Sequence, residues 1–297
     1  MKESALSLVI LALLALTACA PQPTPPETEP DASVAFDGVS VSASAIAISP
    51  DGTGLAAVNP DSGSVTLLSL PRLELKKEIT VGSDPRTLTF SADSKLLYVS
   101  NFGGNSITVL DVEKGAKLTE LPVGAMPYAV IAQKGILYVA EHALGKVSAY
   151  DANTDRLRSQ LDVEDFPAGL ALDADSDILY VTHLFSGKVS LIDLSSFQLE
   201  ALVSTGNTTN LSQFMLLDLP SGRAYLPQTR SNTTNMQLVF DATVFPVVNV
   251  MDLTTQKILR AERGSRIARS ITACPFRDAD NIPIPCAGDN HCGHQHG

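Results

Sequence analysis

An all-β fold built of repeated four-stranded units is predicted by two observations on this sequence. The first is that residues 84–124 contain four short apolar runs, TLTF, LLYVS, ITVLDV and LTELPV, which are separated by turn residues. Each run has the length of one strand, and each gap is short enough for a hairpin. The second is that this pattern recurs with a period of about 40 residues. Such a period with four strands per copy is typical of the blades of a β-propeller.

The copies keep their register over most of the chain. Tyr98, Tyr138 and Tyr180 are 40 and 42 residues apart, and a fifth, looser copy runs from Leu211 to Gly264. We therefore expect about five recognisable blades within residues 34–264, and the set need not be complete. The four copies that align without a gap are LAAVNPDSGSVTLLS (55–69), LYVSNFGGNSITVLD (97–111), LYVAEHALGKVSAYD (137–151) and LYVTHLFSGKVSLID (179–193).

The second strand of three copies carries a family resemblance. It reads YVSN, YVAE or YVTH, and each is followed by a turn with Gly or Asn and by a strand that ends in Asp. These residues resemble the YVTN family of β-propeller repeats over roughly residues 42–264. The resemblance implies the fold, but it does not imply an activity, because propellers host many unrelated functions.

Composition excludes some classes of function. The formal net charge of −11 over 297 residues argues against a nucleic-acid partner, which needs a basic face. We find no nucleophile elbow and no phosphate-binding loop, so no catalytic residue is assigned. The blades contain no cysteine and therefore do not depend on disulfides.

The N-terminal segment predicts export. Residues 1–18 combine a Lys with a short apolar run, as a secretion signal does, and LTAC at 16–19 resembles a bacterial lipobox. By that resemblance Cys19 is acylated and attaches the chain to a membrane of the cell envelope, on its periplasmic or extracellular face. The alternative is an ordinary cleaved signal in which Cys19 is incidental. Residues 19–33 are rich in Pro and predict an extended tether, and residues 34–41 are a candidate strand that closes the ring from the other terminus.

Three columns of the aligned repeats have structural interpretations. A Gly or Asn before the third strand predicts a hairpin turn, because these residues tolerate a positive φ. An Asp at the end of the third strand predicts hydrogen bonds to the following turn, and a Tyr in the second strand predicts packing between blades. The members are Gly63, Asn105, Gly145 and Gly187 for the turn, Asp111, Asp151, Asp193 and Asp252 for the carboxylates, and Tyr98, Tyr138, Tyr180 and Tyr225 for the rings.

A fourth column is polar but chemically different in every copy. It lies at the end of the second strand and consists of Asn59, Asn101, Glu141, His183 and Gln228. A ligand surface diversifies in this way, so these residues are the candidate ligand-binding positions, with capping of the strand ends as the alternative. One His and one carboxylate fall short of a typical metal-ligand set, so neither a metal nor a cofactor is expected.

Two segments depart from the repeat. The fifth copy carries an insert of about 14 residues within 227–247, a candidate binding loop. Residues 265–297 hold three of the four cysteines and lack the strand pattern. We interpret them as a disordered or out-of-frame tail, with a metal site of Cys286, His291, Cys292, His294 and His296 as a further alternative.

The sequence favours a binding or scaffold module of the cell envelope whose ligand is a protein, a glycan or a small molecule. One alternative is an enzyme at the channel mouth, such as a metal-dependent lactonase-like hydrolase that uses Asn59, Asn101, Glu141 and His183. Another is the propeller remnant of a larger redox protein.

Overall fold

The computed structural model describes residues 40–206, 208–231 and 244–259. The predicted signal segment, the predicted tether, Cys19 and the Cys/His tail lie outside these residues. Among the described residues, no helix is long and apolar enough to cross a membrane. The elements are β1 (Ser40–Ser42), β2 (Ile46–Ile48), β3 (Gly54–Asn59), β4 (Ser64–Ser69), β5 (Glu74–Thr80), β6 (Pro85–Phe90), β7 (Leu96–Asn101), β8 (Ser106–Asp111), β9 (Ala116–Pro122), β10 (Pro127–Gln133), β11 (Ile136–Glu141), the 3-10 turn η1 (His142–Leu144), β12 (Lys146–Asp151), β13 (Leu157–Asp162), β14 (Pro167–Asp173), β15 (Ile178–His183), β16 (Lys188–Asp193), β17 (Gln198–Ser204), β18 (Thr209–Asn210), β19 (Leu216–Asp218), β20 (Arg223–Ser231), β21 (Val244–Asp252) and β22 (Lys257–Ile258).

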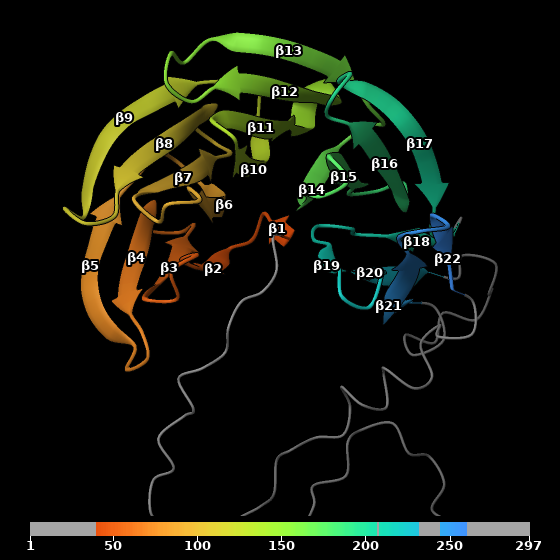
Figure 1. Cartoon of the computed structure of the whole chain (residues 1–297), viewed down its shortest axis with the longest axis horizontal. Coiled ribbons are helices and arrows are strands. Elements are labelled where there is room, and N and C mark those ends of the chain that lie inside the picture. The colour runs from red at the N-terminus through yellow and green to blue at the C-terminus, as the bar shows by residue number, and fades with distance from the viewer. Residues whose placement is uncertain (1–39, 207, 232–243, 260–297) are drawn as a thin grey trace, which may run out of the picture. The chain divides into compact units, whose positions relative to one another are not determined.

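These strands form antiparallel sheets that follow one another along the chain, as Figure 1 shows. We call them blades one to five: β2-β3-β4-β5, β6-β7-β8-β9, β10-β11-β12-β13, β14-β15-β16-β17, and the sheet of β18 to β22. In the fifth blade both β18 and β19 pair with β20, so two short strands share the first position. The prediction of an all-β propeller of four-stranded blades is confirmed.

Burial explains why the strands of one blade differ in composition. The middle strands β7 and β8 are buried almost throughout, because both of their faces pack against neighbouring blades. The outer strand β5, ELKKEIT, has one buried residue in seven and carries its charges into solvent. Apolar clusters fill the spaces between successive blades, and Val, Leu, Ile and Ala supply most of their side chains.

The tyrosine column packs between blades as predicted. Tyr98, Tyr138 and Tyr180 are at most 5% exposed, and each belongs to the apolar cluster shared with the next blade along the chain. Burial raises the pKa of all three phenols, and that of Tyr180 rises to about 12. Tyr225 is only partly buried.

The turn and carboxylate columns also have the predicted geometry. Gly63, Asn105, Gly145 and Gly187 have φ values between 51° and 61°. A Cβ on Gly187 would lie 2.3 Å from the Thr209 carbonyl oxygen, so only glycine fits there. The Asp carboxylates accept hydrogen bonds from amides of the following turn, as Asp111 does from Lys114 N at 2.9 Å and Asp252 from Thr255 N at 2.7 Å.

The described residues differ from two expectations in part. The N-terminal strand does not join the last described blade: β1 pairs with β14, the first strand of blade four, with Ser40 opposite Asp173. β14 is the innermost strand of blade four, and its free edge offers backbone groups with which β1 can pair. The insert of the fifth copy is not wholly a loop either, because it lengthens β20 and β21 into a hairpin of nine residues a strand. Residues 232–243 of the insert lie outside the described residues.

Candidate binding site

The fourth column occupies equivalent positions in all five blades. Asn59, Asn101, Glu141 and His183 are the last residues of β3, β7, β11 and β15, and Gln228 lies within β20. Asn59 is partly buried, and the other four side chains are between 0% and 5% exposed. Buried polar groups need hydrogen-bond partners, so the neighbours of each side chain indicate its role.

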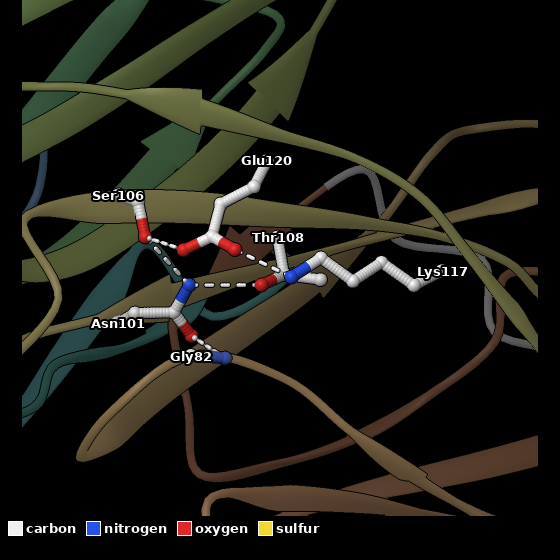
Figure 2. A network of polar contacts seen from close by, with 6 residues as sticks. All are labelled: Gly82, Asn101, Ser106, Thr108, Lys117 and Glu120. Atoms are coloured by element: carbon white, nitrogen blue, oxygen red, sulfur yellow. Dashed lines mark hydrogen bonds and ion pairs between the residues drawn. The ribbon is translucent and has the colours of Figure 1, made fainter.

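Asn101 is bonded within blade two, as Figure 2 shows. Its Nδ2 donates to Ser106 Oγ at 3.0 Å and to Thr108 Oγ1 at 2.8 Å, both on β8. Its Oδ1 accepts from the backbone N of Gly82 at 3.1 Å, in the linker that arrives from blade one. A Cβ on Gly82 would lie 2.4 Å from Asn101 Cγ, so the glycine makes this approach possible. The Asn101 amide therefore joins the second strand, the third strand and the linker.

The network extends to the outer strand through Ser106. The hydroxyl of Ser106 donates to Glu120 on β9, which also forms an ion pair with Lys117. These two contacts lower the pKa of the Glu120 carboxyl. Asn59 is bonded in the same way in blade one, to Ser64 Oγ at 3.0 Å and Thr66 Oγ1 at 2.9 Å.

Blade three exchanges the amide and the carboxylate. Glu141 takes the position of Asn101, and its Oε1 accepts from Gly124 N at 3.1 Å, as Asn101 accepts from Gly82. Gln160 takes the outer-strand position of Glu120 and donates to Glu141 Oε2 at 3.1 Å. Tyr150 also donates to Glu141, at 2.8 Å, and burial together with this carboxylate raises the pKa of Tyr150 well above its usual value.

The last two members are likewise bonded within their own blades. His183 Nδ1 lies 3.3 Å from the Asp165 carbonyl oxygen, which can only accept, so Nδ1 carries the proton and Nε2 accepts from Ser190 Oγ at 2.8 Å. Burial lowers the pKa of His183 to about 4, so the ring is neutral at pH 7. Gln228 donates to Ser212 and accepts from Asn249 Nδ2 at 2.5 Å.

The hydrogen-bond partners described for the five column residues therefore all lie in their own blades or in the linkers that lead to them. Each one joins the strands of its own blade, and three of them, Asn101, Glu141 and His183, also hold the linker from the previous blade. This geometry accounts for the polar character and the burial of the column. Ligand binding by these residues stays a prediction.

A different set of side chains lines the end of the blades where linkers and turns meet. In three blades the residue after the column donates its backbone N–H to the residue before the first-strand proline. The acceptor is the backbone carbonyl oxygen in each case. The bonds run from Phe102 to Asp84 at 3.0 Å, from His142 to Met126 at 3.0 Å, and from Leu184 to Phe166 at 2.9 Å. The same backbone bond therefore brings two variable side chains together in each of the three blades.

Aromatic rings form a continuous row at this end. Phe102 meets Tyr128 edge to face at 5.8 Å between centroids, and Tyr128 lies 5.3 Å from His142. His142 lies 5.3 Å from Phe166, and Phe166 meets Phe185 edge to face at 5.2 Å. The row crosses from blade two to blade four. At its blade-two end the Arg86 guanidinium lies 5.0 Å from the centroid of Phe102 and bonds Asp84 at 2.8 Å.

The blade-four end of this row is open to solvent. Phe166 is 43% exposed and Phe185 is 57% exposed, although such large rings usually pack inside. Three further exposed apolar side chains, Met126, Leu144 and Leu211, come from the same linkers and turns, at 44% to 46% exposure. We call these five residues the aromatic platform. The part of the chain described holds no group of three or more His, Cys, Asp or Glu that could bind a metal.

Three platform residues are held in an unusual backbone conformation. Met126, Phe166 and Leu211 have φ values of 54°, 55° and 56°, in the left-handed region that costs bulky residues about 1–2 kcal/mol. Asp84 has a φ of 50° at the equivalent place before the first-strand proline of blade two, so this conformation recurs in the linkers between blades. The sequence signal was the residue before each first-strand proline, in DPR, MPY and FPA, together with the residues after the column. These positions lie outside the second and third strands, in which the repeat pattern of the sequence is clearest.

Unpartnered polar atoms lie beside the platform. Ser186 Oγ and Asn210 Oδ1 are buried atoms without a hydrogen-bond partner among the described residues, and they adjoin Phe185 and Leu211 in the sequence. His142 Nδ1 lies 3.0 Å from the Pro167 carbonyl oxygen and so donates to it, which leaves Nε2 as an acceptor. Burial lowers the pKa of His142 and keeps the ring neutral at pH 7.

The fold defines the chain as a β-propeller repeat protein, and comparison with known proteins agrees. The model of a family described as "Lactonase, 7-bladed beta-propeller" matches residues 15–123. A curated relative, Antigen Lp49 of Leptospira interrogans, is 26% identical over 159 residues, which cover 46% of this chain and 35% of that protein. This chain therefore matches about a third of the length of that relative.

Solved structures show the same fold at low identity. Hydrazine synthase of Kuenenia stuttgartiensis has a TM-score of 0.65 at 17% identity, over 72% of this chain and 64% of the other. The dihydro-heme d1 dehydrogenase NirN has a TM-score of 0.53 at 20% identity, over 72% and 45%. A functionally unknown protein from Desulfotomaculum acetoxidans has a TM-score of 0.56 at 13% identity, over 73% and 70%.

Proposed function

We propose that this chain is a lipid-anchored propeller of the cell envelope that binds its ligand at the aromatic platform. The observation that carries the proposal is the exposed pair Phe166 and Phe185, flanked by Met126, Leu144 and Leu211. Aromatic and Met side chains are enriched at binding interfaces, and large exposed rings supply contact area at low entropic cost. The loop end of a rigid scaffold is also where propellers and other folds commonly place binding residues.

The anchor and the export signal are part of the same proposal. The apolar run after Lys2 and the sequence LTAC at 16–19 support acylation of Cys19. The test is metabolic labelling with an alkyne-tagged fatty acid in a bacterial host. Label on the wild-type chain and none on Cys19→Ser supports the anchor, whereas equal label on both overturns it.

The binding role is tested by a stability screen of the full chain against several chemical classes. Amines, neutral saccharides, small aromatic compounds and short peptides are each added while the melting temperature is measured. We expect at least one class to raise the melting temperature of the wild type and to lose that effect in Phe166→Ala/Phe185→Ala. If no class depends on the two rings, the platform is not a binding site.

A matched control uses exposed apolar side chains that lie away from the platform. Leu118 on β9 and Leu199 on β17 are 52% and 44% exposed, close to the values for the platform residues. Leu118→Ala/Leu199→Ala should keep every ligand effect of the wild type. Equal loss in both double variants would mean that the effect reflects general surface hydrophobicity.

The hydrolase alternative has less support. Its candidate residues Asn59, Asn101, Glu141 and His183 lie in four different blades, and each is bonded within its own blade. The description of the matched family names a lactonase, but the match covers only residues 15–123. The aromatic platform, which spans blades three to five, favours binding.

A further inference from the structure

Two hydrogen-bonding groups left unpartnered beside the platform are acceptors. Asn210 Oδ1 can only accept, and His142 Nε2 accepts because Nδ1 donates to the Pro167 carbonyl. The Ser186 hydroxyl can act in either direction. A ligand group that satisfies Asn210 Oδ1 or His142 Nε2 must donate a hydrogen bond.

A carboxylate at the platform adds a negative charge. Asp165 directly precedes Phe166, is exposed, and forms no ion pair with any described residue. Its Oδ1 lies 3.6 Å from the place a Cβ on Gly145 would take, so it reaches the turn that carries Leu144. Lys188 on β16 is already paired with Glu164 of the same linker, at 2.8 Å.

The exposed rings complement the same kind of ligand. The face of an aromatic ring attracts a cation within about 6 Å of its centroid, and a nearby carboxylate adds its own attraction for the same charge. At the blade-two end of the row, the Arg86 guanidinium already uses two rings in this way, at 5.0 Å from Phe102 and 5.9 Å from Tyr128. Within the described part of the chain, no Lys or Arg side chain lies over the ring of Phe166 or Phe185. The net charge of −11 further favours a positively charged ligand.

We infer that the aromatic platform binds an organic cation, an ammonium group that carries apolar substituents. The apolar substituents contact Phe166, Phe185 and their exposed neighbours, and the charge lies against the rings and the Asp165 carboxylate. Donor groups of the ligand bond to Asn210 Oδ1 or His142 Nε2. The inference rests on the proposed binding role of the platform and specifies its ligand class.

The experiment compares two probes of nearly equal shape and different charge. Choline carries a quaternary nitrogen where the neutral 3,3-dimethyl-1-butanol carries a carbon atom. Both are titrated into the full chain, and binding is measured by ligand-observed NMR. We expect choline to bind about tenfold more tightly than the neutral probe, with a further loss on Asp165→Asn and on Phe185→Ala. Asp175→Asn, an exposed carboxylate in the turn at the opposite end of blade four, should leave choline binding unchanged.

The outcomes separate this inference from the proposed function. If the neutral probe binds as tightly as choline and both are lost in Phe185→Ala, the platform binds ligands but does not select cations, and the inference is overturned. Equal loss of choline binding in Asp165→Asn and Asp175→Asn would overturn it as well, since net charge alone would then explain the effect. Vesicles of phosphatidylcholine and of phosphatidylglycerol distinguish the source of the cation. Binding to phosphatidylcholine vesicles alone identifies a lipid headgroup, and binding of free choline without vesicle binding identifies a soluble amine.

Discussion

Gln160 donates a hydrogen bond from Nε2 to Oε2 of the fully buried Glu141, at 3.1 Å. In the preceding blade the amide belongs to the second strand, as Asn101, and the carboxylate to the outer strand, as Glu120. The two blades thus place the same pair of chemical groups at exchanged positions. The repeat conserves a hydrogen-bonding arrangement here, and it does so without conserving the residue types.

Removing the amide of Gln160 should destabilise the fold. The variant Gln160→Leu leaves Glu141 Oε2 without its donor in a buried place, at a cost of about 1–3 kcal/mol in the free energy of unfolding. Urea denaturation gives this value. Gln198→Leu, an exposed residue of the outer strand β17, is the control and should change the free energy by less than about 0.5 kcal/mol. A cost for Gln160→Leu no larger than the control would contradict the assigned bond.

The Asn101 amide should matter as much in blade two. Asn101→Leu removes the acceptor of Gly82 N and the donor to Ser106 and Thr108, so we expect a loss of about 2–4 kcal/mol in the free energy of unfolding. Asn59→Leu removes an amide that is partly exposed and makes two such bonds, so its loss should be smaller. The reverse order in urea denaturation would argue against the role of burial.

Two glycines with the same backbone conformation should differ in their response to alanine. Gly187 has a φ of 58° and its Cβ would meet Thr209 at 2.3 Å, whereas Gly222 has a φ of 66° and open space around it. Gly222→Ala therefore pays only the conformational cost, about 1 kcal/mol, and Gly187→Ala should lose roughly 2–4 kcal/mol. Thermal unfolding of both variants measures the difference. Equal shifts in melting temperature would show that the close contact with Thr209 adds no cost to Gly187→Ala.

Stability should depend on pH through His183. Burial lowers its pKa from 6.5 to about 4, so between these values the unfolded chain binds a proton that the folded chain does not. The stability linked to the neutral His183 ring is fully present above pH 6.5. It is lost as the pH falls toward 4, and the free energy of unfolding then decreases by roughly 3 kcal/mol. The charge of Glu164 raises the pKa of His183 and the charge of Lys188 lowers it, so together they change this pH range little.

The measurement for His183 is urea denaturation at pH 7, 5.5 and 4. The wild type should lose stability more steeply than His183→Gln over this range, whereas the two slopes should agree between pH 7 and 8. His142→Gln is the companion variant, since burial lowers the pKa of His142 in the same direction. Identical slopes for wild type and His183→Gln would mean that the ring is not protected from protonation.

The sequence by itself determined the blades. The evidence was a period of about 40 residues, the Tyr column and the turn column. These patterns reflect strand formation, turn formation and packing against the next copy, and such contacts recur in every blade. The structure confirmed the fold, the packing of Tyr98, Tyr138 and Tyr180, and the positive φ of the turn residues. It also supplied partners that no pattern contained, such as Gly82 for Asn101 and Gln160 for Glu141.

Only the tertiary structure decided where the candidate site lies. The polar column diversifies along the sequence, but its side chains are buried and satisfied within single blades. The aromatic platform comes from the linkers before the first strands and from the turns that follow the column. In blades three and four, a backbone bond between residues 16 or 18 apart joins the linker to the turn, from His142 to Met126 and from Leu184 to Phe166. The pairing of β1 with β14 is of the same kind, since it joins residues about 130 apart in the chain. Local patterns record strands and turns, whereas contacts between linkers, turns and distant strands appear only when the blades pack.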